Sequence, residues 1–343
     1  MTTERLAELL GRFPRTAVAV IGDFFLDKYL IMDPALTEIS LETGLEAFQV
    51  VAKRLSPGAA GTVTSNLRAL EVGAVYAIGA VGDDGEGYDL RHGLEATGVD
   101  CRHVLSRAEL FTPTYTKPMV RQANGSETES NRQDIKNRAA IPPQLEEAVI
   151  AELRSCLPDV AGVIVADQVL EAELGIITPR VREELGRLAA DHGDKVFFAD
   201  SRGSIGRFRH MLTKPNRSEA ARAVGWEGAE PSTIEEAAEV GRLLVSQTVA
   251  PVFVTLGEEG LLVVTAEGCE HVPGIRVAGP IDIVGAGDST TAGIVPSLCA
   301  GATPVEAAAV GCLVASITIQ KLGTTGTASP QQVLQRLRET QPR

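Results

Sequence analysis

Short apolar runs recur along the chain and alternate with longer segments of helical periodicity. The apolar runs that end in glycine or acidic residues are typical of buried parallel strands, and the clearest are 16–22, 160–167 and 195–200. Segments with helical spacing lie between and after these runs, and they include 141–157, 178–193 and 304–321. Strands and helices that alternate at a spacing of roughly 30 residues predict an α/β fold with a doubly wound, mostly parallel sheet.

Two further segments have strand patterns of another kind. Residues 111–120 alternate in strand fashion and contain two prolines, which are tolerated at the edge of a sheet. Residues 251–264 predict a hairpin, because two apolar runs flank a turn that is bounded by Gly257 and Gly260.

Composition and charge narrow the class of protein. Hydrophobic residues make up 44% and charged residues 22% of the 343 residues, which is the balance of a globular protein. No apolar run is long enough to cross a bilayer, and residues 1–15 carry charges without the apolar core of a signal peptide. The five cysteines form no C-x-x-C pair, so we expect a reduced, cytoplasmic protein. The net charge of −13 makes nucleic acid an unsuitable partner.

The most informative stretch is the turn Gly285-Ala286-Gly287-Asp288, which is expected to join a strand end to a helix. Small residues let the backbone come close to a ligand, and the free amides at a helix N-terminus bind anions. Asp288 then has two interpretations. It is the N-cap of the helix, or it removes a proton from a hydroxyl that attacks a bound phosphoryl group.

The stretch Asp282-x-x-Gly285-Ala286-Gly287-Asp288 resembles the C-terminal signature of the ribokinase (PfkB) family of sugar kinases. The resemblance implies that Asp288 is the catalytic base and that the Gly285, Ala286 and Gly287 amides form an anion hole for the transferred phosphoryl group. It also implies that Asp282 binds a monovalent cation such as K⁺.

Two further motifs follow the order of that family. Pro215-Asn216-x-x-Glu219 resembles the motif that holds Mg²⁺ mainly through water, although a helix capping box is an alternative compatible with that role. The resemblance also implies that ATP is bordered by Thr255, Gly257 and Gly260. Cys312 stands where the family has an asparagine near adenine.

Most of the residues that the resemblance assigns to sugar binding lie in the first third of the chain. The resemblance implies that Asp27 binds sugar hydroxyls, with Asp23 as a second candidate. It also implies a small β-lid formed by segments of about 28–55 and 108–135 within one kinase domain spanning 1–343. The turn that follows the first lid segment matches the family in part, with Ala59 in place of a glycine, and its candidate substrate contacts are Gly58, Gly61 and Thr62.

Within the family, local similarities favour the bacterial D-glycero-β-D-manno-heptose-7-phosphate kinases, represented by the kinase domain alone. These similarities lie at 39–44 and 321–324, and in the basic residues Lys117, Arg121 and Arg132, which are candidates for holding a phosphate on the substrate. For each cation a solvated strand edge is the alternative. We therefore expect transfer of a phosphoryl group from MgATP to a sugar or sugar phosphate, and a homodimer formed through the lid.

The sequence has alternative interpretations besides a heptose-phosphate kinase. The departures at Ala59, Thr62 and Cys312 suit a catalytically silent sugar- or nucleotide-binding protein, and kinases for ribose or a ketohexose share the same motifs. A Rossmann oxidoreductase would need a Gly-x-Gly-x-x-Gly loop after an early strand, and the segment after 16–22 has none.

Overall fold

The computed structural model describes residues 1–171, 173–227, 230–323 and 325–340. Its main body is built on a nine-stranded sheet, and the strands at one edge form an antiparallel hairpin while the others are parallel. In spatial order the strands are β16 (Cys269–Pro273), β15 (Gly260–Val264), β14 (Val252–Thr255), β13 (Leu212–Thr213), β12 (Val196–Ser201), β11 (Gly162–Asp167), β1 (Ala17–Gly22), β6 (Ala74–Gly82) and β7 (Asp100–Arg107). The predicted α/β fold with a mostly parallel sheet is confirmed, and so is the hairpin at 251–264.

Helices cover both faces of this sheet. One face carries α1 (Thr3–Leu10), α2 (Ala60–Ala69), α3 (Gly85–Ala96), α8 (Ala286–Cys299), α9 (Pro304–Thr318) and α10 (Pro330–Thr340). The other carries α4 (Pro143–Cys156), α5 (Pro179–Asp191), α6 (Arg217–Val224) and α7 (Ile234–Thr248). Short 3₁₀ turns lie at Phe13–Arg15, Pro34–Leu36, Leu157–Asp159, Ile205–Arg207 and Gly257–Glu259. Within the described residues no helix combines the length and apolar character that a membrane crossing requires.

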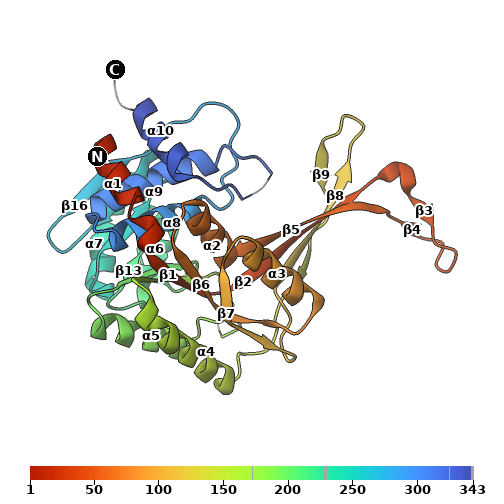
Figure 1. The fold of residues 1–343 in the computed structure, drawn as a ribbon, viewed down its shortest axis with the longest axis horizontal. Coiled ribbons are helices and arrows are strands. Elements are labelled where there is room, and N and C mark those ends of the chain that lie inside the picture. Colours follow the sequence, from red (N-terminus) through yellow and green to blue (C-terminus); the bar gives the residue numbers. More distant parts are fainter. Residues whose placement is uncertain (172, 228–229, 324, 341–343) are drawn as a thin grey trace.

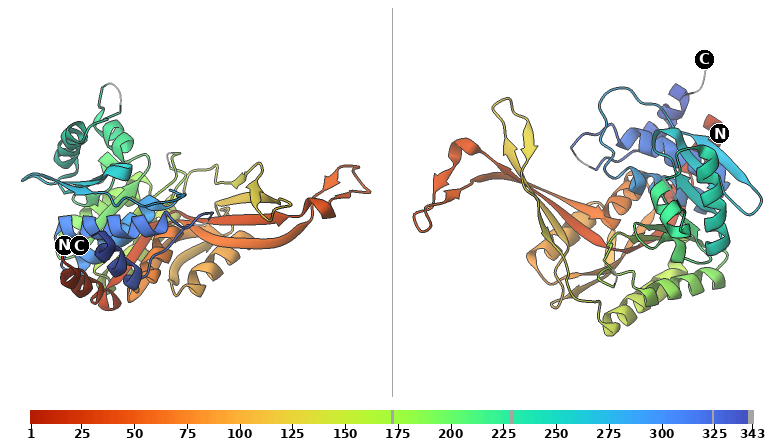
Figure 2. Two further views of the ribbon diagram at one scale, coloured as in Figure 1. Left: turned by 90° about the horizontal axis from the view of Figure 1, so that it is seen from above. Right: turned by 180° about the vertical axis from the view of Figure 1, so that it is seen from behind.

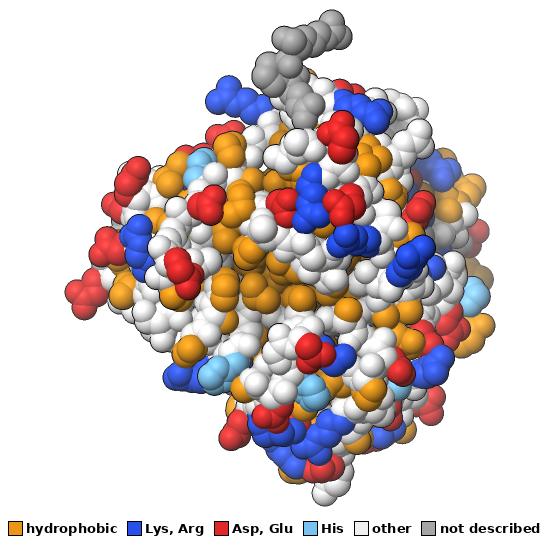
Figure 3. All heavy atoms as spheres, turned by 60° about the vertical axis from the view of Figure 1, so that its left-hand side comes forward, with side chains coloured by type: hydrophobic (Ala, Val, Ile, Leu, Met, Phe, Trp, Pro, Cys, Tyr) orange, Lys and Arg blue, Asp and Glu red, His pale blue; other side chains and the backbone are white. Residues whose placement is uncertain are grey.

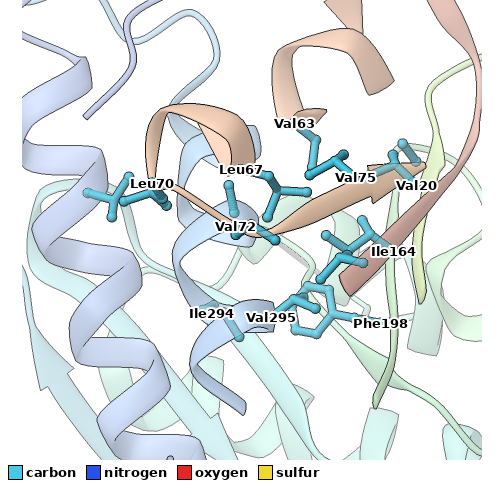
Figure 4. Close-up of a cluster of buried hydrophobic side chains, with 14 of the residues drawn as sticks. Val20, Val63, Leu67, Leu70, Val72, Val75, Ile164, Phe198, Ile294 and Val295 are labelled. Atoms are coloured by element: carbon cyan, nitrogen blue, oxygen red, sulfur yellow. The ribbon is translucent and has the colours of Figure 1, made fainter. Parts of the chain in front are cut away.

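Strand alternation divides the core into layers. In β1, Val18 and Val20 pack toward the α2 and α8 side, whereas Ala19 and Ile21 pack toward the α4 and α5 side. This alternation follows from the two-residue period of a strand that is buried on both faces. Figure 4 shows the first layer, where Val20 and side chains of α2 and α8 meet between helix and sheet. The layer holds the N-terminus of α8 at the carboxyl ends of the parallel strands.

A second sheet leaves the body as a long arm, which is prominent in Figures 1 and 2. Its strands are β10 (Gln133–Ile135), β8 (Thr114–Arg121), β2 (Phe24–Met32) and β5 (Val50–Ala59), with β9 (Glu127–Glu129) paired to β8. A small hairpin of β3 (Glu38–Ile39) and β4 (Glu46–Ala47) forms the tip. This arm occupies the segments expected for the lid. Its strands β2 and β5 reach beyond 28–55 into the body, because only one residue separates the end of β1 from the start of β2.

Candidate active site

The turn before α8 has the shape that its sequence predicts. Gly285 has a φ of 80° and occupies the N-cap position, so a residue without a side chain suits this backbone. Asp288 is the third residue of the helix, and the interpretation of Asp288 as the N-cap is therefore wrong. The amide of Ala286 already donates to the carbonyl of Ile283 at 3.1 Å. In the part of the chain that the structure describes, the amide of Gly287 has no such acceptor, so it is the better candidate for an anion.

The surroundings of Asp288 change its acidity. Burial raises the pKa of the Asp288 carboxyl to about 7, and the negative charge of Asp200 acts in the same direction. The cations Lys214 and Arg202 oppose this shift. A carboxyl with a pKa close to neutrality is half deprotonated at pH 7, which suits a general base.

Lys214 completes the site, although it was not among the candidate residues predicted from the sequence motifs. Its amine lies 2.8 Å from Asp200 Oδ2 in a nearly buried ion pair, and it would be 3.3 Å from a Cβ placed on Gly287. Burial alone would lower the pKa of Lys214, but Asp200 and Asp288 outweigh it, so the pKa is raised and the amine is charged. The signal in the sequence was its place directly before Pro215, inside the motif assigned to Mg²⁺.

The Asn216 motif lies at the start of α6 as a complete capping box. The Asn216 side chain accepts from the Glu219 amide, and Glu219 accepts from the Asn216 amide, each at 2.8 Å. Burial raises the pKa of Glu219. Asn216 also forms an isolated bridge with Thr255, and the Thr255 amide donates to Pro215. The folding of these segments therefore brings the second and third sequence motifs together.

Of the predicted nucleotide residues, Cys312 lines a cavity on one side of the body, and the glycines form a turn beside it. Gly257 and Gly260 have φ values of 63° and 99°, and a Cβ on Gly260 would come within 2.2 Å of the Val272 carbonyl. Next to this turn, a cavity of about 660 Å³ lies between the 271–276 segment, α9 and α10, and Cys312 lines it. Its walls include several apolar side chains: Val272, Ile275, Val305, Ala309, Leu313 and Leu337. Figure 3 shows the side of the molecule that includes β16, where hydrophobic side chains gather across the middle of the face.

The arrangement of charged and polar groups around the start of α8 also suits a triphosphate with Mg²⁺. Lys214 and the Gly287 amide offer positive groups, whereas Asn216 and Glu219 offer the oxygen ligands that Mg²⁺ prefers. No group of three or more His, Cys, Asp or Glu side chains is arranged to hold a metal within the described ranges. The donor set accordingly fits an ion that keeps waters and phosphate oxygens as most of its ligands.

The candidate sugar residues lie where the lid meets the body. Lys117 Nζ is 2.9 Å from Asp27 Oδ1, and a Cβ on Gly58 would lie 2.5 Å from Asp27 Oδ2. Thr62, in the first turn of α2, comes within 3.3 Å of a Cβ placed on Gly285. The segment 58–62 therefore spans the space between Asp27 and the turn before α8.

Some candidates have other contacts. A Cβ on Gly61 would lie 2.5 Å from Pro57, so this glycine serves close packing within the turn. Arg132 is bound to Asp134 at 2.7 Å and stacks 4.3 Å from the centre of the Tyr115 ring, on the exposed side of the lid. Arg121 is exposed at the end of β8.

Asp23 is not available to a sugar, in contrast to the expectation. Its carboxylate accepts hydrogen bonds from the backbone amides of Gln168, Val169 and Ile176 at 2.8–3.1 Å, and the residue is only 4% exposed. Burial raises the pKa of Asp23 while these amides lower it. Asp23 therefore holds the segment after β11 to the end of β1, which is a structural role.

Asp282 joins two segments near the site. Its carboxylate accepts from the amides of Val284 and Gly323, and its own amide donates to the Ile319 carbonyl. The monovalent-cation role expected for Asp282 would involve this junction. Thr324, part of the heptose-kinase similarity, lies outside the described residues.

A second buried carboxyl lies behind Asp200. Burial raises the pKa of Asp167 to about 6, although the Ser201 hydroxyl donates to it at 2.6 Å and Arg182 lies 3.8 Å away. Asp167 ends β11 opposite Ser201, one position beyond Asp200 in β12. Because side chains alternate along a strand, the two carboxyl groups lie on opposite faces of the sheet.

The chain is similar in sequence to several known proteins. The chain is 28% identical over 318 residues to bifunctional protein HldE of Citrifermentans bemidjiense, covering 92% of this chain and 62% of the relative. It is 30% identical over 324 residues to bifunctional protein HldE of Caulobacter sp. (strain K31), covering 94% of this chain and 63% of the relative. The chain thus spans less than two thirds of the length of these curated relatives.

Solved structures share the fold. Arabidopsis thaliana ribokinase complexed with ribose and ATP aligns with a TM-score of 0.66 at 17% identity, covering 94% of this chain and 99% of that chain. Phosphofructokinase-2 from Escherichia coli in complex with substrates and products aligns with a TM-score of 0.68 at 20% identity and the same coverages.

The sequence pattern described as pfkB family carbohydrate kinase matches residues 49–332, which is most of the chain. The resemblance inferred from the glycine turn and its companion motifs is confirmed, as is the expectation of a phosphotransferase. The chain belongs to the pfkB family of carbohydrate kinases.

Proposed function

We propose that the protein transfers the γ-phosphoryl group of MgATP to a hydroxyl of a sugar phosphate, with heptose 7-phosphate as the leading acceptor. The observation that carries this proposal is the convergence of Asp288, Lys214 and the Gly287 amide at the start of α8. A base, a buried cation and a free amide at one helix N-terminus are the groups that phosphoryl transfer requires.

Each group has one task in this proposal. Asp288 accepts the proton of the attacking hydroxyl, and its raised pKa lets it do so near neutral pH. The Lys214 amine and the Gly287 amide stabilise the negative charge on the transferred group, because both lie at the turn and the amine is held in place by Asp200. Asp27 accepts hydrogen bonds from acceptor hydroxyls and so fixes the direction of attack.

The proposal also includes places for the nucleotide and the ions near the same turn. The adenine base occupies the apolar cavity lined by Cys312, next to the 257–260 turn. Asn216 and Glu219 would hold Mg²⁺, mainly through water, and the ion would supply positive charge next to the phosphates. Asp282 would hold a monovalent cation such as K⁺, as the family resemblance implies, and its carboxylate joins the turn before α8 to the 319–323 segment.

The choice of heptose 7-phosphate rests on sequence. The similarities at 39–44 and 321–324 favour that branch, and relatives named bifunctional protein HldE are consistent with it. Ribose and ketohexoses are the alternative acceptors, because their kinases share the motifs around Asp288.

The arm also supports a homodimer. Large apolar side chains are exposed along the tip and β5, among them Ile39 at 61%, Leu45 at 69% and Phe48 at 59%. An exposed apolar strand surface of this kind is suited to a partner. Sedimentation velocity of the native protein and of Phe48→Glu tests this: a dimer that becomes a monomer supports the lid contact, and a native monomer contradicts it.

The experiment for the function is ATP turnover with a panel of acceptors, including heptose 7-phosphate, ribose and fructose 6-phosphate, with Asp288→Asn as the control. Turnover of one acceptor that is lost in the variant supports the kinase and identifies its substrate. Binding of ATP without turnover of any acceptor would instead favour a catalytically silent binding protein.

A further inference from the structure

Three side chains form a row across the lid sheet. Tyr29 in β2 lies opposite Arg54 in the antiparallel neighbour β5 and opposite Lys117 in the parallel neighbour β8. Residues paired across adjacent strands present their side chains on the same face, so the three lie together. Arg54 Cζ is 5.2 Å and Lys117 Nζ 4.7 Å from the centre of the Tyr29 ring, and Lys117 also donates to the Tyr29 hydroxyl at 3.2 Å.

The row lies beyond the residue assigned to the sugar hydroxyls. Asp27 precedes Tyr29 by two positions, so both side chains are on one face and roughly 7 Å apart along the strand. Because β2 runs outward from the body, Tyr29 is the farther of the two from α8. The order along the site is therefore the Gly285 turn, Thr62, Asp27 and then the row.

The two cations of the row are placed where they can bind an anion. Two cations against one aromatic ring repel each other, and each has a carboxylate partner: Lys117 contacts Asp27 at 2.9 Å, and Arg54 contacts Glu127 in β9 at 2.7 Å. Arg54 keeps about half of its side chain exposed, so its guanidinium can exchange partners. A phosphate oxygen group can accept from an arginine, a lysine amine and a tyrosine hydroxyl together.

We propose that Arg54, Tyr29 and Lys117 bind a phosphoryl group carried by the acceptor at the end opposite to the hydroxyl that is phosphorylated. This inference rests on the proposed kinase function and adds two residues, Arg54 and Tyr29, that set its specificity. Selection of a phosphorylated acceptor then comes from the lid, whereas the chemistry belongs to the start of α8. The acceptor must be long enough to reach from Asp288 past Asp27 to the row.

A purely structural role for Arg54 makes a different prediction. If its ion pair with Glu127 only fastened β9 to β5, loss of either partner would have the same effect, and every acceptor would be affected alike. If Arg54 binds a phosphoryl group, Glu127 competes with that group, so the two substitutions have different effects.

The test compares acceptor pairs that differ only in a phosphate: sedoheptulose 7-phosphate with sedoheptulose, fructose 6-phosphate with fructose, and ribose 5-phosphate with ribose. For Arg54→Gln we expect KM for the preferred phosphorylated acceptor to rise at least tenfold, with kcat and the KM for ATP within about twofold of the native values. Glu127→Gln should leave this KM unchanged or lower it. Tyr29→Phe should raise it a few-fold.

Arg102→Gln is the matched control, because Arg102 also pairs with an acid, Asp100, and approaches a tyrosine ring, Tyr76, but lies on β7 away from the lid. This substitution should change neither kcat nor the KM values for the acceptor and ATP. Equal losses on phosphorylated and unphosphorylated acceptors in Arg54→Gln, or the same loss in Glu127→Gln, would overturn the proposal.

Failure of the kinase function can be told apart from failure of this site. If the native protein turns over no acceptor, titration calorimetry with sedoheptulose 7-phosphate and with sedoheptulose tests the row directly, without ATP. Tighter binding of the phosphorylated sugar that is lost in Arg54→Gln supports the site even then. Equal binding of the two sugars, or binding that is unchanged in Arg54→Gln, refutes it.

Discussion

The pH dependence of turnover follows from the raised pKa of Asp288. A base with a pKa of about 7 is half deprotonated at pH 7, roughly a tenth at pH 6 and roughly a hundredth at pH 5. Because only the deprotonated carboxylate accepts the hydroxyl proton, kcat/KM should fall about fivefold from pH 7 to pH 6 and about tenfold from pH 6 to pH 5. It should level off above pH 8.

The substitution Asp288→Asn removes the base without changing the size of the side chain. General bases contribute about 10²- to 10⁴-fold, so kcat should fall by that factor while the KM for ATP changes little. The small residual rate should also lose the inflection near pH 7. The assay is ADP release measured from pH 5 to pH 9 with a coupled system whose own enzymes are in excess.

Asp167 provides the control, because burial raises its pKa to about 6 although it lies behind Asp200. Asp167→Asn should leave the inflection near pH 7. A native profile that is flat between pH 5.5 and 8 would refute the assignment of the base. An inflection that persists in Asp288→Asn but vanishes in Asp167→Asn would show that Asp167, and not Asp288, is the titrating group.

Three other substitutions separate the roles of neighbouring residues. Lys214→Met should lower kcat by about 100-fold and move the pH inflection upward, because Lys214 lowers the pKa of Asp288; an unchanged profile in a folded variant contradicts this. Cys312→Phe should raise the KM for ATP about tenfold by filling the apolar cavity, with the KM for the acceptor as the unaffected reference. Asp23→Asn should cost about 3 kcal/mol in urea unfolding, since three buried amides lose part of their acceptor; a variant of native stability but raised acceptor KM would restore Asp23 as a sugar ligand.

The local pattern of apolar residues in the sequence was sufficient to predict the fold. The apolar runs at 16–22, 160–167 and 195–200 became β1, β11 and β12 of the parallel sheet, because continuous burial on both faces leaves a clear signal in sequence. The turn before α8 was equally readable, since it depends on small residues in consecutive positions.

Contacts between distant segments were harder to predict. Asp23 and Asp27 lie only four positions apart after the first apolar run, and only the fold decides that one faces the amides of 168–176 while the other faces Lys117. The importance of Lys214 likewise depends on Asp200, which arrives from another strand. Arg54 joins Tyr29 and Lys117 only through the pairing of three strands, for which the sequence carries no local mark.

The single residue between β1 and β2 has a mechanical consequence. Asp23 is the entire connection between the strand in the body and the strand that leads the arm, and its carboxylate is fastened to the backbone beyond β11. The base of the arm is therefore fixed to the body. We expect the tip to move by bending of the long strands and not by rotation about a flexible hinge. We expect hydrogen exchange to be slow at residues 22–26 and to quicken toward the hairpin at 38–47, so that the arm closes by flexing along its length.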